Sequence, residues 1–172
     1  MVDREKVSEL TTALVSILEE QIRVYRHLLD CVRKEKDILV SANLDDLNEN
    51  NRTKEAMLIK ARALESQRLE LTTKVWLELK LEGEAPRLLE IARHLGSDLA
   101  DKLRNIQSVL ELLLKRVQEF NKQNESLVQA ALSNITGAMN AIKGTLAEKP
   151  TYQKKGEVEG TTSAGQLVSR EA

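Results

Sequence analysis

The feature of this sequence that most constrains its fold is the scarcity of residues that break helices. The chain has 172 residues, yet its first glycine is Gly83 and its only prolines are Pro86 and Pro150. Folds built on β-sheets need glycine, proline and asparagine turns far more often than this. Aromatic residues make up only 2% of the chain, so the apolar fraction of 41% is mainly aliphatic. The sequence therefore predicts an all-α protein with an aliphatic core.

The charge balance and the hydropathy of the chain argue against proteins that bind nucleic acid or insert into membranes. Lys and Arg number 26 and Asp and Glu number 27, a net charge of −1. This balance argues against electrostatic binding of nucleic acid or of an anionic membrane. No apolar run approaches the ~20 residues that span a bilayer, and the first residues lack the apolar run of a signal peptide. We therefore expect a soluble, cytoplasmic protein without membrane insertion.

Residues that carry enzyme chemistry are few and isolated. His27 and His94 have no second histidine or cysteine at ligand spacing, and Cys31, the single cysteine, falls at an apolar position of the first predicted helix. Glycine-rich phosphate loops do not occur. Many carboxylates lie four residues before a base, as Glu70 does before Lys74, which is typical of solvated helix surfaces. We expect no catalytic activity, no metal and no cofactor.

The pattern of residues in the first half of the chain predicts a helical hairpin. A helix is predicted over about residues 3–41, because its apolar positions alternate in steps of three and four, and a second over about 44–81. Asn43 is the expected N-cap of the second helix, and Gly83 its left-handed cap at the other end. The short connection makes the two helices antiparallel. The first helix has two stripes: Val7, Leu10, Leu14, Ile17, Gln21, Val24, Leu28, Cys31, Glu35 and Ile38, beside Leu18, Ile22, Tyr25, Leu29, Val32 and Leu39.

A third helix is predicted over about residues 87–147, with Gly96 and Gly137 as points where it can kink or restart. Its seam is Leu99, Leu103, Ile106, Leu110, Leu113, Val117, Phe120, Asn124, Leu127 and Ala131. From residue 98 this helix would be ~75 Å long against ~57 Å for the hairpin helices. Its last part is therefore expected to extend beyond the hairpin helices and to have no partner within the chain. That part still carries large apolar side chains, namely Leu127, Val128, Leu132, Ile135, Met139, Ile142 and Leu146. An apolar face of that kind indicates a binding surface or a seam for self-association.

Two polar features stand out beside this face. Asn124 interrupts the apolar seam, and a buried amide without a partner is costly. It is expected either to hydrogen-bond to a partner or to a facing polar residue and so set the register, or to be solvated. From residue 148 to 172 the composition turns to Gly, Ser and Thr, which predicts a disordered tail after a helical domain over 1–147. Tyr152 in this tail either packs on the helix end or anchors a partner.

Three segments, in order, resemble the flagellar export chaperone family FlgN. The first is the charged-then-leucine segment at residues 54–58, which is followed by Glu65-Ser66-Gln67-Arg68. The second is the Asn-x-x-Asn-x-x-Leu stretch from Asn121 to Leu127, and the third is the Tyr-x-x-x-Gly element from Tyr152 to Gly156. Together they cover the chain from about residue 50 to 160. The last two, at this separation, are the most specific part of the resemblance.

The resemblance implies a cytoplasmic chaperone that binds the helical termini of the hook–filament junction proteins FlgK and FlgL. It also implies delivery of this cargo to the type III export gate, whose component FlhA contacts the tyrosine past the last helix. In this chain Tyr152 and Gly156 match that element. The family's cargo contact lies on the last helix, which corresponds here to Asn121, Asn124, Leu127, Val128, Ala131, Ile135, Met139 and Ile142.

A coiled-coil scaffold or adaptor is the alternative function that the pattern leaves open. In such a protein the apolar end of the third helix would seal a permanent homodimer, whereas a chaperone exposes it when alone.

Overall fold

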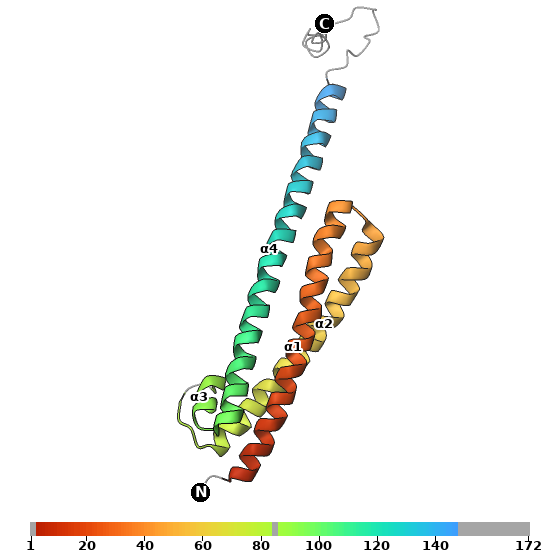
Figure 1. Cartoon of the computed structure of the whole chain (residues 1–172). Coiled ribbons are helices and arrows are strands. Elements are labelled where there is room, and N and C mark those ends of the chain that lie inside the picture. The colour runs from red at the N-terminus through yellow and green to blue at the C-terminus, as the bar shows by residue number, and fades with distance from the viewer. Residues whose placement is uncertain (1–2, 84–85, 148–172) are drawn as a thin grey trace, which may run out of the picture. The chain divides into compact units, whose positions relative to one another are not determined.

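The computed structural model describes residues 3–83 and 86–147, and the regular structure in these ranges is helical. The helices are α1 (Arg4–Ser41), α2 (Leu44–Glu78), α3 (Leu88–Arg93) and α4 (Ser97–Ala147), as labelled in Figure 1. This confirms the all-α prediction of a long hairpin followed by a longer helix, since α4 has 51 residues. The tail predicted over residues 148–172 lies outside the described residues.

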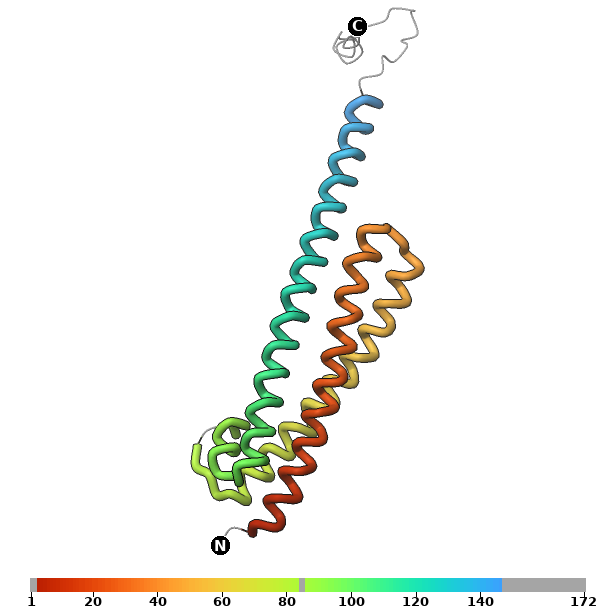
Figure 2. Tube along the Cα trace, in the orientation of Figure 1, coloured from red at the N-terminus to blue at the C-terminus, as the bar shows by residue number. Residues whose placement is uncertain are grey.

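Polar side chains define the start of both hairpin helices. The carboxylate of Asp3 accepts a hydrogen bond from the amide of Lys6 at 3.2 Å, which caps α1. The side-chain oxygen of Asn43 accepts from the amides of Asp45 and Asp46 at 3.1 and 3.3 Å, so Asn43 is the N-cap of α2 as predicted. Only Ala42 and Asn43 connect α1 to α2. Figure 2 traces this tight turn in orange.

The end of α2 differs from the prediction. The helix stops at Glu78, and the left-handed residue after it is Lys80, with φ of 54°, in place of the expected Gly83. The amide of Lys80 donates to the carbonyl of Leu77 at 3.0 Å, and that of Leu81 donates to Trp76 at 3.2 Å. This is the Schellman pattern, which ends a helix by satisfying its last carbonyls. The pattern fixes the cap three residues earlier than the glycine suggested.

Lys80→Gly is expected to raise the free energy of unfolding by about 1 kcal/mol, because glycine adopts positive φ without the steric penalty that lysine has there. Urea unfolding of the full chain measures the change. Lys115→Gly is the control, since Lys115 is an exposed residue inside α4 and its replacement should lower stability by about 1 kcal/mol. Equal destabilisation by both variants would contradict the role of Lys80.

The helix predicted over residues 87–147 is divided at residues 94–96, one of the two points at which a break was expected. The short α3 ends with the amide of His94 donating to Ile91, and α4 starts with the amide of Ala100 donating to Gly96. The division lets α3 bury Leu88, Ile91 and Ala92. At Gly137, by contrast, α4 continues without interruption.

The chain divides into two units at Leu127 and Val128. Unit 1, residues 1–127, is a bundle of α1, α2, α3 and the first part of α4, which lie side by side in Figure 1. One core cluster joins all four helices around Leu14, Leu18, Val75, Ile91 and Leu103. Smaller clusters follow along α1, the last of them formed by Leu28, Leu29, Val32, Leu113 and Val117. Both predicted stripes of α1 are buried or half-buried in this bundle.

Candidate partner-binding surface

The second half of α4 carries an exposed row of large aliphatic side chains. Val128, Leu132, Ile135, Met139, Ile142 and Leu146, here called the α4 apolar face, have exposed fractions of 41% to 58%. Their spacing of three and four residues places them on one side of the helix. Leu127, the last residue of unit 1, is also exposed at 37%. Contiguous apolar surface of this kind on a protein marks a site of interaction.

The main part of the α4 apolar face, from Val128 to Ile142, lies in a stretch of sequence without charged residues. Between Glu125 and Lys143 the sequence holds no Asp, Glu, Lys or Arg. In this stretch a partner would therefore be recognised by shape and apolar area. Binding of this type depends little on ionic strength, because there is no ion pair to screen.

Two glycines lie within this segment of α4 without a packing reason among the described residues. A Cβ built at Gly137 or Gly144 meets no atom within 4 Å. Each glycine makes an exposed helix interior about 1 kcal/mol less stable than alanine would. The segment is therefore helical but only weakly stabilised by its own residues, a property that suits a surface that adapts to a partner.

The residues predicted to bind cargo fall into two groups. Asn121 and Ala131 are exposed, as are Leu127, Val128, Ile135, Met139 and Ile142. Asn124 differs, because only 4% of its surface is exposed and its amide bonds to α1. The prediction of a facing polar partner for Asn124 is confirmed, and the alternative of a solvated side chain is wrong. Asn124 therefore belongs to the bundle rather than to the exposed face.

The contacts of Asn124 form a polar layer across unit 1. Its Nδ2 donates to the carbonyl oxygen of Val32 at 2.8 Å and to Oε2 of Glu35 at 3.1 Å. Glu35 Oε1 in turn accepts from Lys54 Nζ of α2 at 2.7 Å. Glu35 is one of the two polar positions in the predicted apolar stripe of α1. That exception in the stripe was the sequence signal for this layer, although the sequence did not identify its partners.

The Glu-x-x-Arg motif of α2 ties the two hairpin helices together. Arg68 donates to both carboxylate oxygens of Glu65, at 2.8 and 2.6 Å. These bonds lower the pKa of the Glu65 carboxyl, with a smaller contribution from Gln21. Gln21 of α1 donates to Glu65 at 3.0 Å and is itself 2% exposed. The motif thus satisfies the other polar residue of the α1 stripe.

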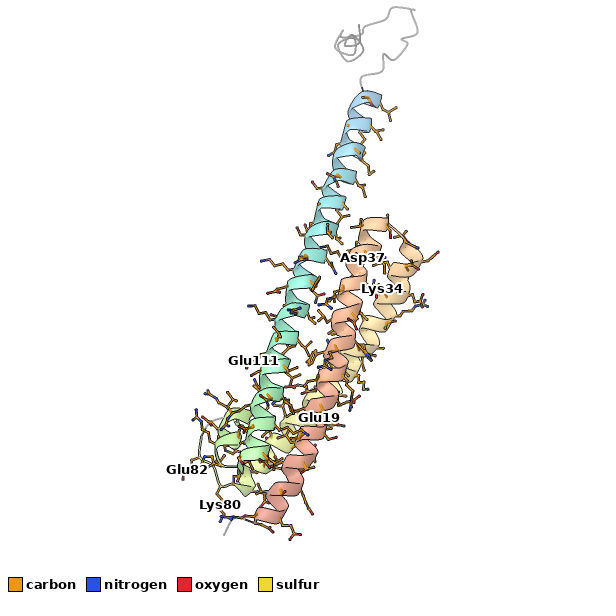
Figure 3. The ribbon with its side chains drawn as sticks, viewed as in Figure 1. Glu19, Lys34, Asp37, Lys80, Glu82 and Glu111 are labelled. Atoms are coloured by element: carbon orange, nitrogen blue, oxygen red, sulfur yellow. The ribbon has the colours of Figure 1, made fainter. Side chains whose placement is uncertain are left out.

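Surface charges and the isolated reactive residues have ordinary positions. Cys31 is buried, and burial raises the pKa of its thiol. Figure 3 labels Glu19 and Glu111, which contact residues other than the bases four positions after them, Arg23 and Lys115. Glu19 pairs with Lys102 of α4 at 2.8 Å, and Glu111 accepts from Gln107 at 2.7 Å. These are exposed contacts that contribute little to stability.

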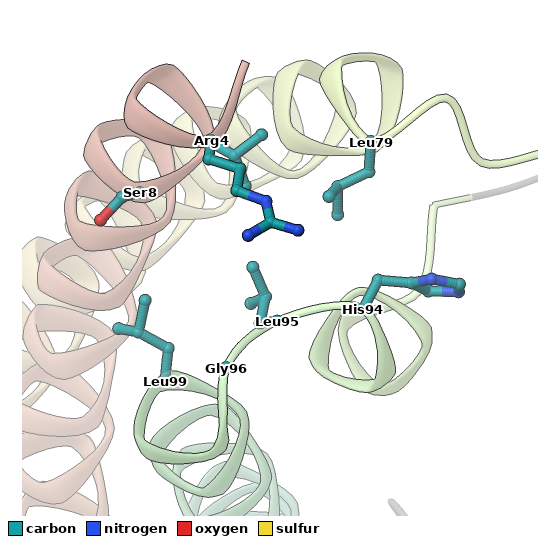
Figure 4. Close-up of a pocket in the computed structure, with 8 residues that line it drawn as sticks. Arg4, Ser8, Leu79, His94, Leu95, Gly96 and Leu99 are labelled. Carbon is teal, nitrogen blue, oxygen red and sulfur yellow. The ribbon is translucent and has the colours of Figure 1, made fainter. Parts of the chain in front are cut away.

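A cavity of about 620 Å³ lies in unit 1 where α1 begins, α2 ends and α3 connects to α4. Figure 4 shows the guanidinium of Arg4 pointing into it between Leu79 and Leu95, with His94 to one side. Neither a carboxylate nor a thiol is found among the described residues that line it. The cavity is therefore lined by aliphatic side chains together with two basic ones.

Residues 3–83 and 86–147 also bear on metal binding and on membrane insertion. Nowhere in these ranges do three His, Cys, Asp or Glu side chains gather as a metal site would require. None of the helices described there is both long and apolar enough to cross a bilayer. Tyr152 and Gly156, the residues expected to contact the export gate, lie outside the described residues.

Comparison with known proteins identifies the family. The profile of the family described as FlgN protein matches residues 1–160, nearly the whole chain. No curated protein and no solved structure that was compared matches the chain. The matched range includes all four helices and the Tyr-x-x-x-Gly element. The chain therefore belongs to the FlgN protein family, and its function is that of a flagellar export chaperone.

Proposed function

We propose that this chaperone is cytoplasmic and that it binds the helical terminal segments of the junction proteins FlgK and FlgL through the α4 apolar face. The observation that carries the proposal is the row of six large aliphatic side chains left 41% to 58% exposed on one side of a helix. An amphipathic helix of a partner can cover such a row with anchors three and four residues apart. The proposal includes no catalytic step and no cofactor.

The opposing contributions to the binding free energy suit a chaperone that first binds its cargo and later releases it. Burial of aliphatic area favours binding, but ordering a helix that contains Gly137 and Gly144 opposes it. The net affinity is then moderate, and the export machinery can remove the cargo without nucleotide hydrolysis by the chaperone. Covering the cargo's own apolar stripe prevents premature self-association of the junction proteins.

Titration calorimetry of the full chain with synthetic terminal segments of FlgK and of FlgL tests the proposal. We expect a 1:1 complex with a negative heat-capacity change, because apolar surface is buried. Light scattering of the chaperone alone should give a monomer. A permanent dimer that binds neither segment would favour the alternative, in which a second copy covers the α4 apolar face and the protein acts as a scaffold.

Delivery to the export gate is proposed to depend on Tyr152. A tyrosine offers a large ring and one hydroxyl at little entropic cost, which suits a shallow pocket on FlhA. Tyr152→Ala is expected to weaken binding of the cargo-loaded chaperone to the cytoplasmic domain of FlhA by about 2 kcal/mol, as is typical of a hot spot. Calorimetry measures this. Cargo affinity should not change, and equal gate affinity for variant and wild type would mean that the gate contacts another surface.

A further inference from the structure

The polar layer of Asn124, Glu35 and Lys54 joins three helices through one carboxylate. Each oxygen of Glu35 serves a different helix: Oε1 accepts from Lys54 of α2 at 2.7 Å, and Oε2 accepts from Asn124 of α4 at 3.1 Å. The side chains of Glu35 and Lys54 are 13% and 23% exposed, so the layer is largely shielded from water. Asn124 is the last buried residue of α4 in the described chain.

The layer is incompletely satisfied on the α4 side. Nδ2 of Asn124 has two acceptors, but its Oδ1 is buried and has no hydrogen-bond partner among the described residues. Because both neighbours of the amide nitrogen can only accept, the amide cannot be reversed to relieve this. A buried polar network with one orphaned atom holds its elements together less firmly than apolar packing does.

The seam residues of α4 keep the same spacing of three and four residues before and after this polar layer. Leu113 and Val117 are buried before it, Phe120 is half-buried with the guanidinium of Arg33 5.3 Å from its ring centroid, and Leu127 is exposed after it. All of them, with Asn124, follow the same alternation of three and four residues. A partner helix that covers Leu127 would therefore meet the same type of surface at the preceding turns, once these are free of α1.

We propose that the Asn124–Glu35–Lys54 layer is a latch that sets how much of the α4 seam is open to a partner, and that a bound cargo helix opens it. The proposal rests on the function proposed above for the identity of the partner. Opening leaves no buried charge without its partner, because Glu35 keeps Lys54 when Asn124 leaves. The freed Oδ1 then accepts a hydrogen bond from water or from the cargo. The latch regulates the extent of the cargo site on α4.

Two substitutions of Asn124 should move the latch in opposite directions. Asn124→Leu replaces the orphaned amide by an aliphatic side chain that packs beside Phe120 of the seam and closes the latch. Asn124→Asp places a second carboxylate beside Glu35 and the carbonyl of Val32, which opens it by repulsion. The matched control is Asn50→Leu, because Asn50 is equally buried at 4% and donates to the neighbouring carbonyl of Cys31 at 3.1 Å, but belongs to α2.

Amide hydrogen exchange of the full-length free protein, followed by mass spectrometry, tests the latch without any partner. We expect peptides covering residues 113–127 to exchange roughly tenfold more slowly in Asn124→Leu and roughly tenfold faster in Asn124→Asp. Asn50→Leu should leave these peptides within about twofold of wild type. Exchange over residues 113–127 that is the same in wild type, Asn124→Leu and Asn124→Asp would overturn the proposal.

Binding of the FlgK and FlgL terminal segments then tests the coupling to cargo. Asn124→Leu should bind roughly fivefold more weakly than wild type, since opening is part of binding, and Asn124→Asp should bind at least as tightly. Equal affinities in all three proteins would overturn the coupling while leaving the proposed cargo site intact. If no protein binds either segment, the proposed cargo is wrong, and the exchange measurements still decide whether the layer is a latch.

Discussion

Leu127→Asp combined with Ile135→Asp is expected to abolish capture of the FlgK and FlgL terminal segments. Both side chains are exposed in the free protein, at 37% and 58%, so two carboxylates there are well solvated and the fold is unaffected. A bound aliphatic helix would remove that solvation without providing a hydrogen-bond donor. The dissociation constant should rise by about three orders of magnitude, the equivalent of about 4 kcal/mol.

Pull-down and calorimetry measure the loss, and circular dichroism should show unchanged helix content. The matched control is Ser133→Asp with Asn140→Asp, which adds the same two charges to exposed positions on the side of α4 away from the apolar face. Because the control pair lies away from the α4 apolar face, we expect it to bind within about threefold of wild type. Undiminished capture by the first pair would move the cargo site away from this face.

Ile91→Ala is expected to lower the free energy of unfolding by about 3 kcal/mol, the largest effect on stability that we predict. Ile91 is fully buried, at 0% exposed, in the cluster that joins all four helices. It belongs to the six-residue helix α3, which has no side-chain hydrogen bond at its N-cap. A helix this short has little stability of its own, so its place depends on buried side chains.

Urea unfolding followed by tryptophan fluorescence measures this change directly, because Trp76 is the single tryptophan and packs in the same cluster. Leu89→Ala is the control on the same helix, with Leu89 47% exposed, and should change stability by less than about 1 kcal/mol. If the two substitutions cost the same, α3 is not held by the face that buries Ile91.

Periodicity alone predicted most of the fold. The two stripes of α1 and the seam of α4 as far as Asn124 are buried or half-buried at nearly every position named from the sequence. This succeeded because an amphipathic helix can bury only the side on which its apolar residues recur. The N-cap at Asn43 was equally predictable, since an asparagine before two aspartates matches the local needs of a helix start.

Residue preferences for local conformation did not predict where α2 ends. Gly83 is the residue that tolerates positive φ best, yet Lys80 takes the left-handed position after α2. Packing of Leu81 and Trp76 in the core cluster accounts for this, because the Schellman turn at Lys80 brings both side chains to it. A propensity of about 1 kcal/mol is easily outweighed by the burial of two large side chains.

For the candidate site, too, one part could be predicted from the sequence and another depended on the tertiary structure. The sequence by itself determined that α4 would carry aliphatic residues beyond the reach of a hairpin of this length, because helix rise per residue is fixed. Tertiary structure alone decided that burial ends at Asn124, and that in the free chain this asparagine bonds to the Val32 carbonyl and to Glu35 of α1. The physical reason is that spacing specifies which side of a helix is apolar, whereas the groups that face each polar residue depend on how distant segments pack.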